Sequence, residues 1–111
     1  MKRDKLCLIH MKEALKRIES YVGGGQAQFT ASTLVQDAVL WNLQYISESV
    51  KLLSDHAKTT HPELDWQHLS KIRHVHVHTT LGPDPSELWQ IVANELPGLQ
   101  KKVRGVLATI V

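Results

Sequence analysis

Two side chains five positions apart, Arg73 and His78, have chemistry suited to cleaving RNA without a metal. A guanidinium can hold a phosphate through two parallel hydrogen bonds and stabilise the added charge of the transition state. An imidazole titrates near neutral pH, so it can take the proton of an attacking 2′-hydroxyl or protonate the leaving 5′-oxygen. The pair is a candidate ribonuclease site, although an arginine and a histidine at this spacing occur by chance in many proteins.

The spacing of this pair constrains how it could work. Five residues of α-helix turn the chain by roughly 500°, which would place Arg73 and His78 about 140° apart around the helix axis. Side chains that far apart do not share a face. Either the helix ends between them, or the site combines residues from two copies of the chain around a dimer axis.

The same segment carries three histidines in alternation, His74, His76 and His78. In a strand all three would line one face and could bind a metal. In a helix only His74 and His78 share a face, as a possible zinc pair. Since no cysteine cluster or third carboxylate pattern accompanies them, and helical patterns flank them, the sequence predicts a helix, no metal and no cofactor. His76 is then incidental, and His74 is a supporting residue.

Four amphipathic segments must position this pair. Apolar residues recur every three or four positions over about 4–22, 32–58, 66–79 and 86–111. These segments predict an all-α, up-and-down bundle of four to five helices in a single domain, residues 1–111.

Local signals mark the ends of these segments. Residues expected at N-caps are Asp4, Thr30 or Ser32, and Asp65. Three glycines at 23–25 should end the first helix, and Pro97 should kink or split the last one.

The second segment has more apolar surface than one bundle core requires. One stripe contains Val35, Val39, Asn42, Ile46, Val50 and Leu53, and a second beside it contains Leu34, Ala38, Trp41, Tyr45 and Leu52. A stripe this wide contacts more than one neighbour, and another copy of the chain is a candidate. We therefore expect a homodimer.

Composition sets broad limits. The 111 residues are 42% hydrophobic and 22% charged, as in ordinary globular domains, and the net charge of +2 is too small to indicate nucleic acid by itself. No apolar run approaches the ~20 residues of a membrane span. The single cysteine, Cys7, cannot form an intrachain disulfide, so we expect a cytoplasmic protein.

The chain resembles the HEPN family, specifically the minimal HepT-like toxins of bacterial and archaeal toxin–antitoxin pairs. The HEPN signature is an arginine, a polar residue, a few positions and a histidine, which Arg73, His74 and His78 satisfy. The flanking positions that carry the likeness are 11–14, 18–19, Tyr21, Phe29, 37–43, Ile46, Glu48, 51–54, Pro62, Trp66, Ile72, Trp89, 91–92, 95–97 and Leu99.

The resemblance implies a helical bundle that dimerises with its two motifs facing a shared cleft. It implies a metal-independent endoribonuclease toxin with Arg73 and His78 as catalytic residues, in a type VII-like pair with a nucleotidyltransferase antitoxin called MntA. That antitoxin transfers AMP to a tyrosine two residues after the motif histidine. This chain has Thr80 there, preceded by Thr79, and it has Trp41 where related chains often have arginine.

Two further expectations concern neighbours of the motif. Glu48 is a candidate buried partner that would orient the Arg73 guanidinium, with simple exposure as the alternative. Thr79 or Thr80 is the candidate AMP acceptor. The alternative function is a catalytically degenerate HEPN module that binds and positions a nucleotidyltransferase.

Overall fold

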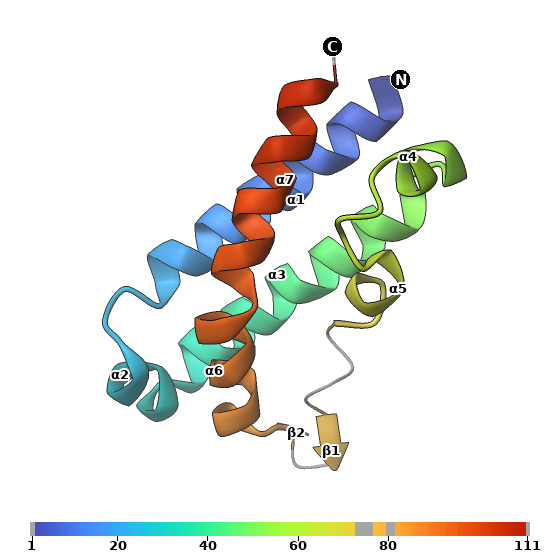
Figure 1. The fold of residues 1–111 in the computed structure, drawn as a ribbon. Helices are drawn as coiled ribbons and strands as arrows, with labels where there is room; N and C mark the ends of the chain where they lie inside the picture. The colour runs from blue at the N-terminus through green and yellow to red at the C-terminus, as the bar shows by residue number, and fades with distance from the viewer. Residues whose placement is uncertain (1, 73–76, 80–81, 111) are drawn as a thin grey trace.

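The computed structural model describes residues 2–72, 77–79 and 82–110. These residues form seven helices and a two-stranded ribbon: α1 Lys2–Tyr21, α2 Gln26–Ala31, α3 Thr33–Leu52, α4 Asp55–Thr60, α5 Trp66–Leu69, β1 Val77–Thr79, β2 Gly82–Pro83, α6 Pro85–Asn94 and α7 Leu96–Thr109. Three long helices, α1, α3 and α7, run side by side with alternating direction, and both chain ends meet at one end of the bundle (Figure 1). The predicted all-α bundle is confirmed, with more and shorter helices than expected.

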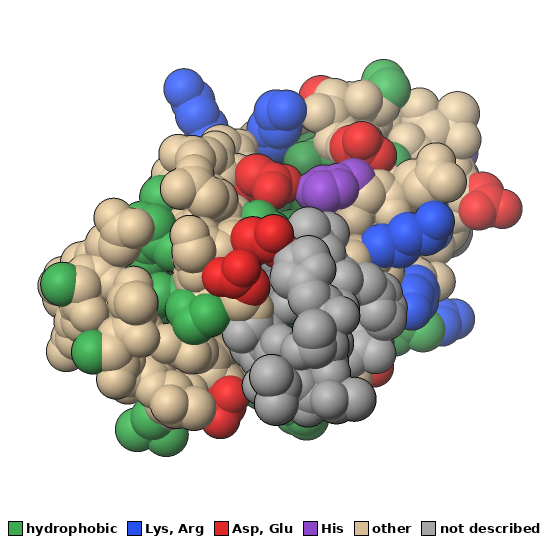
Figure 2. Space-filling view, turned by 90° about the horizontal axis from the view of Figure 1, so that it is seen from below, with side chains coloured by type: hydrophobic (Ala, Val, Ile, Leu, Met, Phe, Trp, Pro, Cys, Tyr) green, Lys and Arg blue, Asp and Glu red, His purple; other side chains and the backbone are tan. Residues whose placement is uncertain are grey.

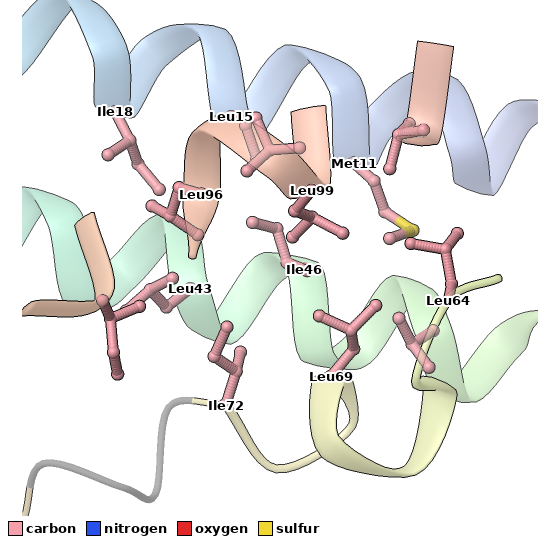
Figure 3. Close-up of a cluster of buried hydrophobic side chains, with 14 of the residues drawn as sticks. Met11, Leu15, Ile18, Leu43, Ile46, Leu64, Leu69, Ile72, Leu96 and Leu99 are labelled. Carbon is pink, nitrogen blue, oxygen red and sulfur yellow. The ribbon is translucent and has the colours of Figure 1, made fainter. Parts of the chain in front are cut away.

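One apolar core joins the three long helices (Figure 3). From α1 come Met11, Leu15 and Ile18, and α3 contributes Leu43 and Ile46, all 3% exposed or less. Leu96 and Leu99 from α7 close the core. Burying each such side chain contributes about 1.5–3 kcal/mol, so this packing fixes the bundle from which the motif segment leaves.

The two apolar stripes of the second segment have different environments. Members of the first stripe, such as Val39, Ile46 and Val50, are fully buried. In the second stripe, Leu34 is 81% exposed and Trp41 is 67% exposed. The second stripe therefore forms an exposed apolar surface along α3.

The second predicted helix is divided in two. Ser32 caps α3, since its Oγ accepts the Val35 N–H at 3.2 Å, which confirms one of the two expected caps. The expectation of one helix to about residue 58 is wrong. Ser54 starts α4 instead, because its Oγ accepts the Ala57 N–H at 3.1 Å while the preceding Leu53 is extended.

The sequence predicted Asp4 as an N-cap, but Asp4 has a different role in the structure. It lies inside the first turn of α1, which begins at Lys2, and its side chain is buried. Its carboxylate accepts the Ser54 N–H at 2.9 Å and the Ser54 hydroxyl at 2.8 Å. Asp4 therefore ties the start of α1 to the start of α4.

Pro97 splits the last segment, as predicted. Helix α6 ends at Asn94 and α7 begins at Leu96, so Pro97 lies in the first turn of α7. A proline is tolerated there because its missing N–H would have no partner within the helix.

The third predicted helix is much shorter than expected. Asp65 caps α5 by accepting the His68 N–H at 3.0 Å, as predicted, but the helix ends at Leu69. Residues 77–79 form β1, which pairs antiparallel with β2, so the prediction of helix through residue 79 is wrong there. Valine and threonine favour extended backbone, and the period of two seen in the sequence reflects this strand.

None of the helices formed by the described residues is long and apolar enough to cross a lipid bilayer.

Candidate functional site

The motif segment runs between α5 and α6, and β1 and β2, which lie within it, are found beside the start of α6 at the end of the bundle opposite the chain termini (Figure 1). His78 and Thr79 belong to β1, and β1 pairs with β2 in a register that sets Val77 opposite Pro83. Arg73, His74 and Thr80 lie outside the described residues. The catalytic, supporting and modification roles given to these residues stay predictions.

The chain enters the motif from a fixed point in the core. Ile72, directly before Arg73, is fully buried, and its side chain extends from the end of the α5 segment toward α3 (Figure 3). One turn earlier, the Leu69 carbonyl accepts the hydroxyl of the buried Ser47 on α3 at 3.0 Å. These two contacts hold the entrance of the motif against the middle of α3.

Trp66 secures the other side of α5. Its indole N–H donates to the carbonyl of His61 at 2.9 Å and of Lys58 at 3.1 Å. The ring packs against the core while its polar edge closes the end of α4. Trp66 therefore anchors α5 to the core and to the end of α4.

The chain leaves the motif through the capped start of α6. The Asp84 carboxylate accepts the Ser86 N–H at 2.9 Å, and Pro85 occupies the first turn. Leu88 of α6 is fully buried. The ring of Trp89 packs at a tilt against the ring of Phe29 on α2, with 5.3 Å between the ring centroids. The segment is thus anchored on both sides by elements that belong to the core.

A groove of about 300 Å³ ends beside the motif entrance, between α5 and the α6–α7 junction. Its lining residues are Leu64, Asp65, His68, Leu69, Ile72, Asn94, Glu95, Gly98, Leu99 and Lys102. Across it, His68 Nε2 lies 2.7 Å from Glu95 Oε1. The sequence reasoning missed this pair, because its partners are 27 residues apart and only the packing of α5 against α6 brings them together.

The described surface around the motif carries charges of both signs. Asp84 caps α6 and Glu87 lies in its first turn, whereas the groove is lined by two acids, Asp65 and Glu95, and by Lys102. Figure 2 shows acidic side chains and a histidine bordering one side of the part of the chain that is not described, and basic side chains bordering the other side. A polyanion approaching over the acidic side would be repelled by these carboxylates, so cations elsewhere on the surface have to add to its attraction.

Glu48 is exposed, which is the alternative that the sequence left open. The expectation that Glu48 is buried is therefore wrong. The Glu48 Oε1 accepts the Gln44 amide at 3.3 Å, one turn earlier on α3. No group of three or more possible metal ligands forms among the described residues, and His74 and His76 lie outside them.

Comparison with known proteins adds a family to this geometry. A family model described as ribonuclease HepT-like matches residues 11–106, which include Arg73 and His78. A protein named "Probable ribonuclease HepT" from Thermococcus cleftensis is 31% identical over 104 residues, covering 92% of this chain and 94% of its own.

Two other relatives have similar names. A "Putative RNase" from Caldanaerobacter subterraneus is 26% identical over 108 residues, covering 96% of each chain. A "Gamma-glutamylcyclotransferase and putative RNase" from Methanocaldococcus jannaschii is 25% identical over 109 residues, and this chain spans 49% of its length. No solved structure matches the chain significantly.

Proposed function

We propose that this chain, which belongs to the HepT-like ribonuclease family, is a metal-independent endoribonuclease toxin acting in the cytoplasm. The observation that carries the proposal is the match of the family model across the motif. The clamped segment supports it, because a catalytic pair needs a rigid frame and Ile72 and Asp84 provide fixed points on both sides.

The proposed chemistry is an internal transfer within RNA. The 2′-oxygen attacks the adjacent phosphorus and loses its proton to a base, and the bond from phosphorus to the 5′-oxygen breaks. The products are a 2′,3′-cyclic phosphate and a 5′-hydroxyl that takes up a proton. Arg73 holds the phosphate and stabilises its added charge, and His78 serves as general acid or base, supported by His74.

We further propose that two copies form the active unit. The exposed α3 stripe, with Leu34, Trp41 and Leu52, offers apolar surface for a second copy, and the half-buried Tyr45 lies on the same side of the helix. A symmetric dimer would supply both motifs to one cleft, so that Arg73 of one copy could act with His78 of the other.

Control is proposed to come from a nucleotidyltransferase antitoxin. It would either cover the cleft or transfer AMP to a threonine hydroxyl, Thr79 or Thr80, in place of the family's tyrosine. The intact mass of the chain after co-expression with the cognate nucleotidyltransferase separates the two. A mass increase of whole AMP units mapped to either threonine supports modification, and an unchanged mass supports steric blocking.

Expression in a bacterial host tests the toxin proposal. Wild-type chain should slow growth, while Arg73→Ala and His78→Ala should each restore it with the protein still folded. His76→Ala is the matched control and should stay toxic. Equal growth inhibition by wild type and both motif variants would contradict the assignment of the site.

The second candidate is a catalytically degenerate HEPN module that binds and positions a nucleotidyltransferase. Trp41 favours this alternative, since the family resemblance implies an arginine there, and the acids on one side of the motif would oppose RNA that approaches over them. In that case the purified chain would bind the nucleotidyltransferase and leave RNA intact.

A further inference from the structure

The charges of this protein are segregated in a way that its net charge conceals. Nine of the thirteen lysines and arginines lie on α1 and α7, against three of the eleven acids. These two helices together therefore carry a formal charge of +6, and the rest of the chain carries −4. Because α1 and α7 pack side by side, the excess is concentrated on one part of the surface (Figure 1).

A groove between α1 and α7 displays part of this charge. It has a volume of about 590 Å³, and it is lined by Ile9, Lys12, Glu13, Lys16, Arg17, Ser20 and Leu107. Lys12 and Lys16 stand one helical turn apart on α1, and both are exposed. Two cations one turn apart along a groove can follow consecutive groups of an extended anion.

The other side of the groove is formed by α7. Gln100 and Leu107 both face α1, since each lines a cavity shared with that helix. Arg104 lies four residues after Gln100 and three before Leu107, so it belongs to the same side of α7. Arg104 is exposed, as is Lys101. Leu107 is the α7 residue that lines the groove, and helical spacing places Arg104 beside it at the edge of the groove.

These cations are not neutralised within the described part of the chain. The two ion pairs there are His61 with Glu63 and His68 with Glu95, and neither includes a lysine or arginine. Of the three acids on α1, Asp4 is buried against Ser54, and Glu13 is the one acid among the groove's lining residues, against three cations, Lys12, Lys16 and Arg17. The positive face is therefore available to an external anion.

We infer that the α1–α7 face binds the phosphate backbone of single-stranded RNA, an inference that rests on the proposed ribonuclease function. This face adds to the attraction from the two described cations near the motif, Lys71 and Lys102, which lie among acids. The RNA would be captured along Lys12, Lys16 and Arg104 and extend toward the motif at the end of the bundle. Lysine and arginine contacts of this kind fix position and carry little sequence preference.

The observations favour RNA over the two other anionic partners. A membrane surface is bound by amphipathic helices that insert large apolar side chains, and the most exposed ones here, Leu34 and Trp41, lie on α3. A stable protein partner would need an apolar centre in its interface. The apolar members of this groove, Ile9 and Leu107, are half-buried.

Binding of a 2′-O-methyl RNA tests the inference apart from catalysis, because without a free 2′-hydroxyl the strand cannot be cleaved by the proposed route. The test variant is Lys12→Glu/Lys16→Glu/Arg104→Glu, and a control reverses two cations elsewhere, Lys51→Glu/Lys58→Glu. Affinity for a 16-nucleotide strand is measured by anisotropy between 50 and 200 mM salt. Lys58 is half-buried and the other four positions are exposed, and circular dichroism checks that both variants are folded.

The expected result follows from counterion release. Each phosphate contact to a single strand contributes roughly 0.7 to the slope of log affinity against log salt. Losing three contacts should reduce the magnitude of that slope by about 2 and weaken binding on the order of 100-fold at 0.1 M salt. The control should keep most of the wild-type slope. Equal slopes for the test variant and the control would overturn the inference.

Two more arms separate the other outcomes. Binding is also measured for polyglutamate of equal charge and for anionic phosphatidylserine vesicles. If either binds as tightly as the RNA and loses binding in the same variant, the assignment to RNA is overturned. If the 2′-O-methyl RNA binds as expected but ordinary RNA is never cut, the surface stands and the ribonuclease proposal fails. If ordinary RNA is cut while the test variant binds normally, only this inference fails.

Discussion

Replacing Asp4 should show how much the contact between the start of α1 and the start of α4 stabilises the fold. The Asp4 side chain is 4% exposed, and its two oxygens accept the N–H and the hydroxyl of Ser54, 50 residues away. The Ser54 hydroxyl oxygen also accepts the Ala57 N–H, so the contact continues into the cap of α4. Losing the carboxylate would loosen α1 from α4 and weaken that cap.

The expected loss of stability can be estimated from these two hydrogen bonds. A hydrogen bond to a charged group contributes about 1.5–3 kcal/mol, and a buried donor left without a partner costs about 1–3 kcal/mol. Because the contributions overlap, Asp4→Ala should lower the free energy of unfolding by about 3 kcal/mol. Asp4→Asn keeps one acceptor oxygen and should lose about 1–2 kcal/mol.

The pH dependence gives this prediction a second readout. The backbone N–H of Ser54 lowers the pKa of Asp4, more than burial raises it, with help from the Ser54 hydroxyl. A carboxyl whose pKa is lower in the folded state stabilises the fold above its unfolded pKa. That stabilisation disappears as pH falls through the folded value. The difference between wild type and Asp4→Asn should therefore be full at pH 7 and shrink below about pH 4.

Urea denaturation followed by circular dichroism at pH 7, 5 and 3 measures both effects. Asp55→Asn is the matched control, since Asp55 is an exposed acid next to Ser54 at the start of α4, and it should change stability by less than about 1 kcal/mol. If Asp4→Asn were as stable as wild type at pH 7, or if its deficit were the same at pH 3, the account of this contact would be refuted.

Two other substitutions test separate parts of the structure. Gln100 Nε2 is buried beside a cavity of about 130 Å³ and has no hydrogen-bond partner among the described residues. Gln100→Leu should therefore raise the free energy of unfolding by about 1 kcal/mol in urea titrations, and a comparable loss would show that the amide is satisfied in solution. Trp41→Glu should convert the proposed dimer to a monomer in light scattering at micromolar concentration while the melting temperature of the fold is retained; an unchanged dimer would place the interface elsewhere.

Features set by neighbours in the sequence could be predicted from the sequence. Ser32 and Asp65 cap their helices by binding N–H groups three residues ahead, and Pro97 divides the last segment through its own ring. The division of the second segment was missed because Ser54 looks like an interior residue of a long helix. Its partner Asp4 is 50 residues away, and that contact depends on the packed bundle.

The site was predictable in its residue types and less so in its surroundings. Five alternating residues gave too weak a signal to predict β1, since a short strand depends on the pairing of residues such as Val77 with a partner like Pro83. The contact between His68 and Glu95 also arises only when α5 packs near the α6–α7 junction. Charge segregation onto α1 and α7, in contrast, was present in the sequence once helix boundaries were known.

The chemistry of the cleaved ends tests the central claim most directly. Purified chain is incubated with single-stranded RNA in excess EDTA, and the products are analysed by mass spectrometry. The account predicts cleavage that leaves 2′,3′-cyclic phosphate and 5′-hydroxyl ends and that disappears in Arg73→Ala and His78→Ala. Activity that is lost in EDTA and restored by zinc, or cleavage retained in both motif variants, would contradict it.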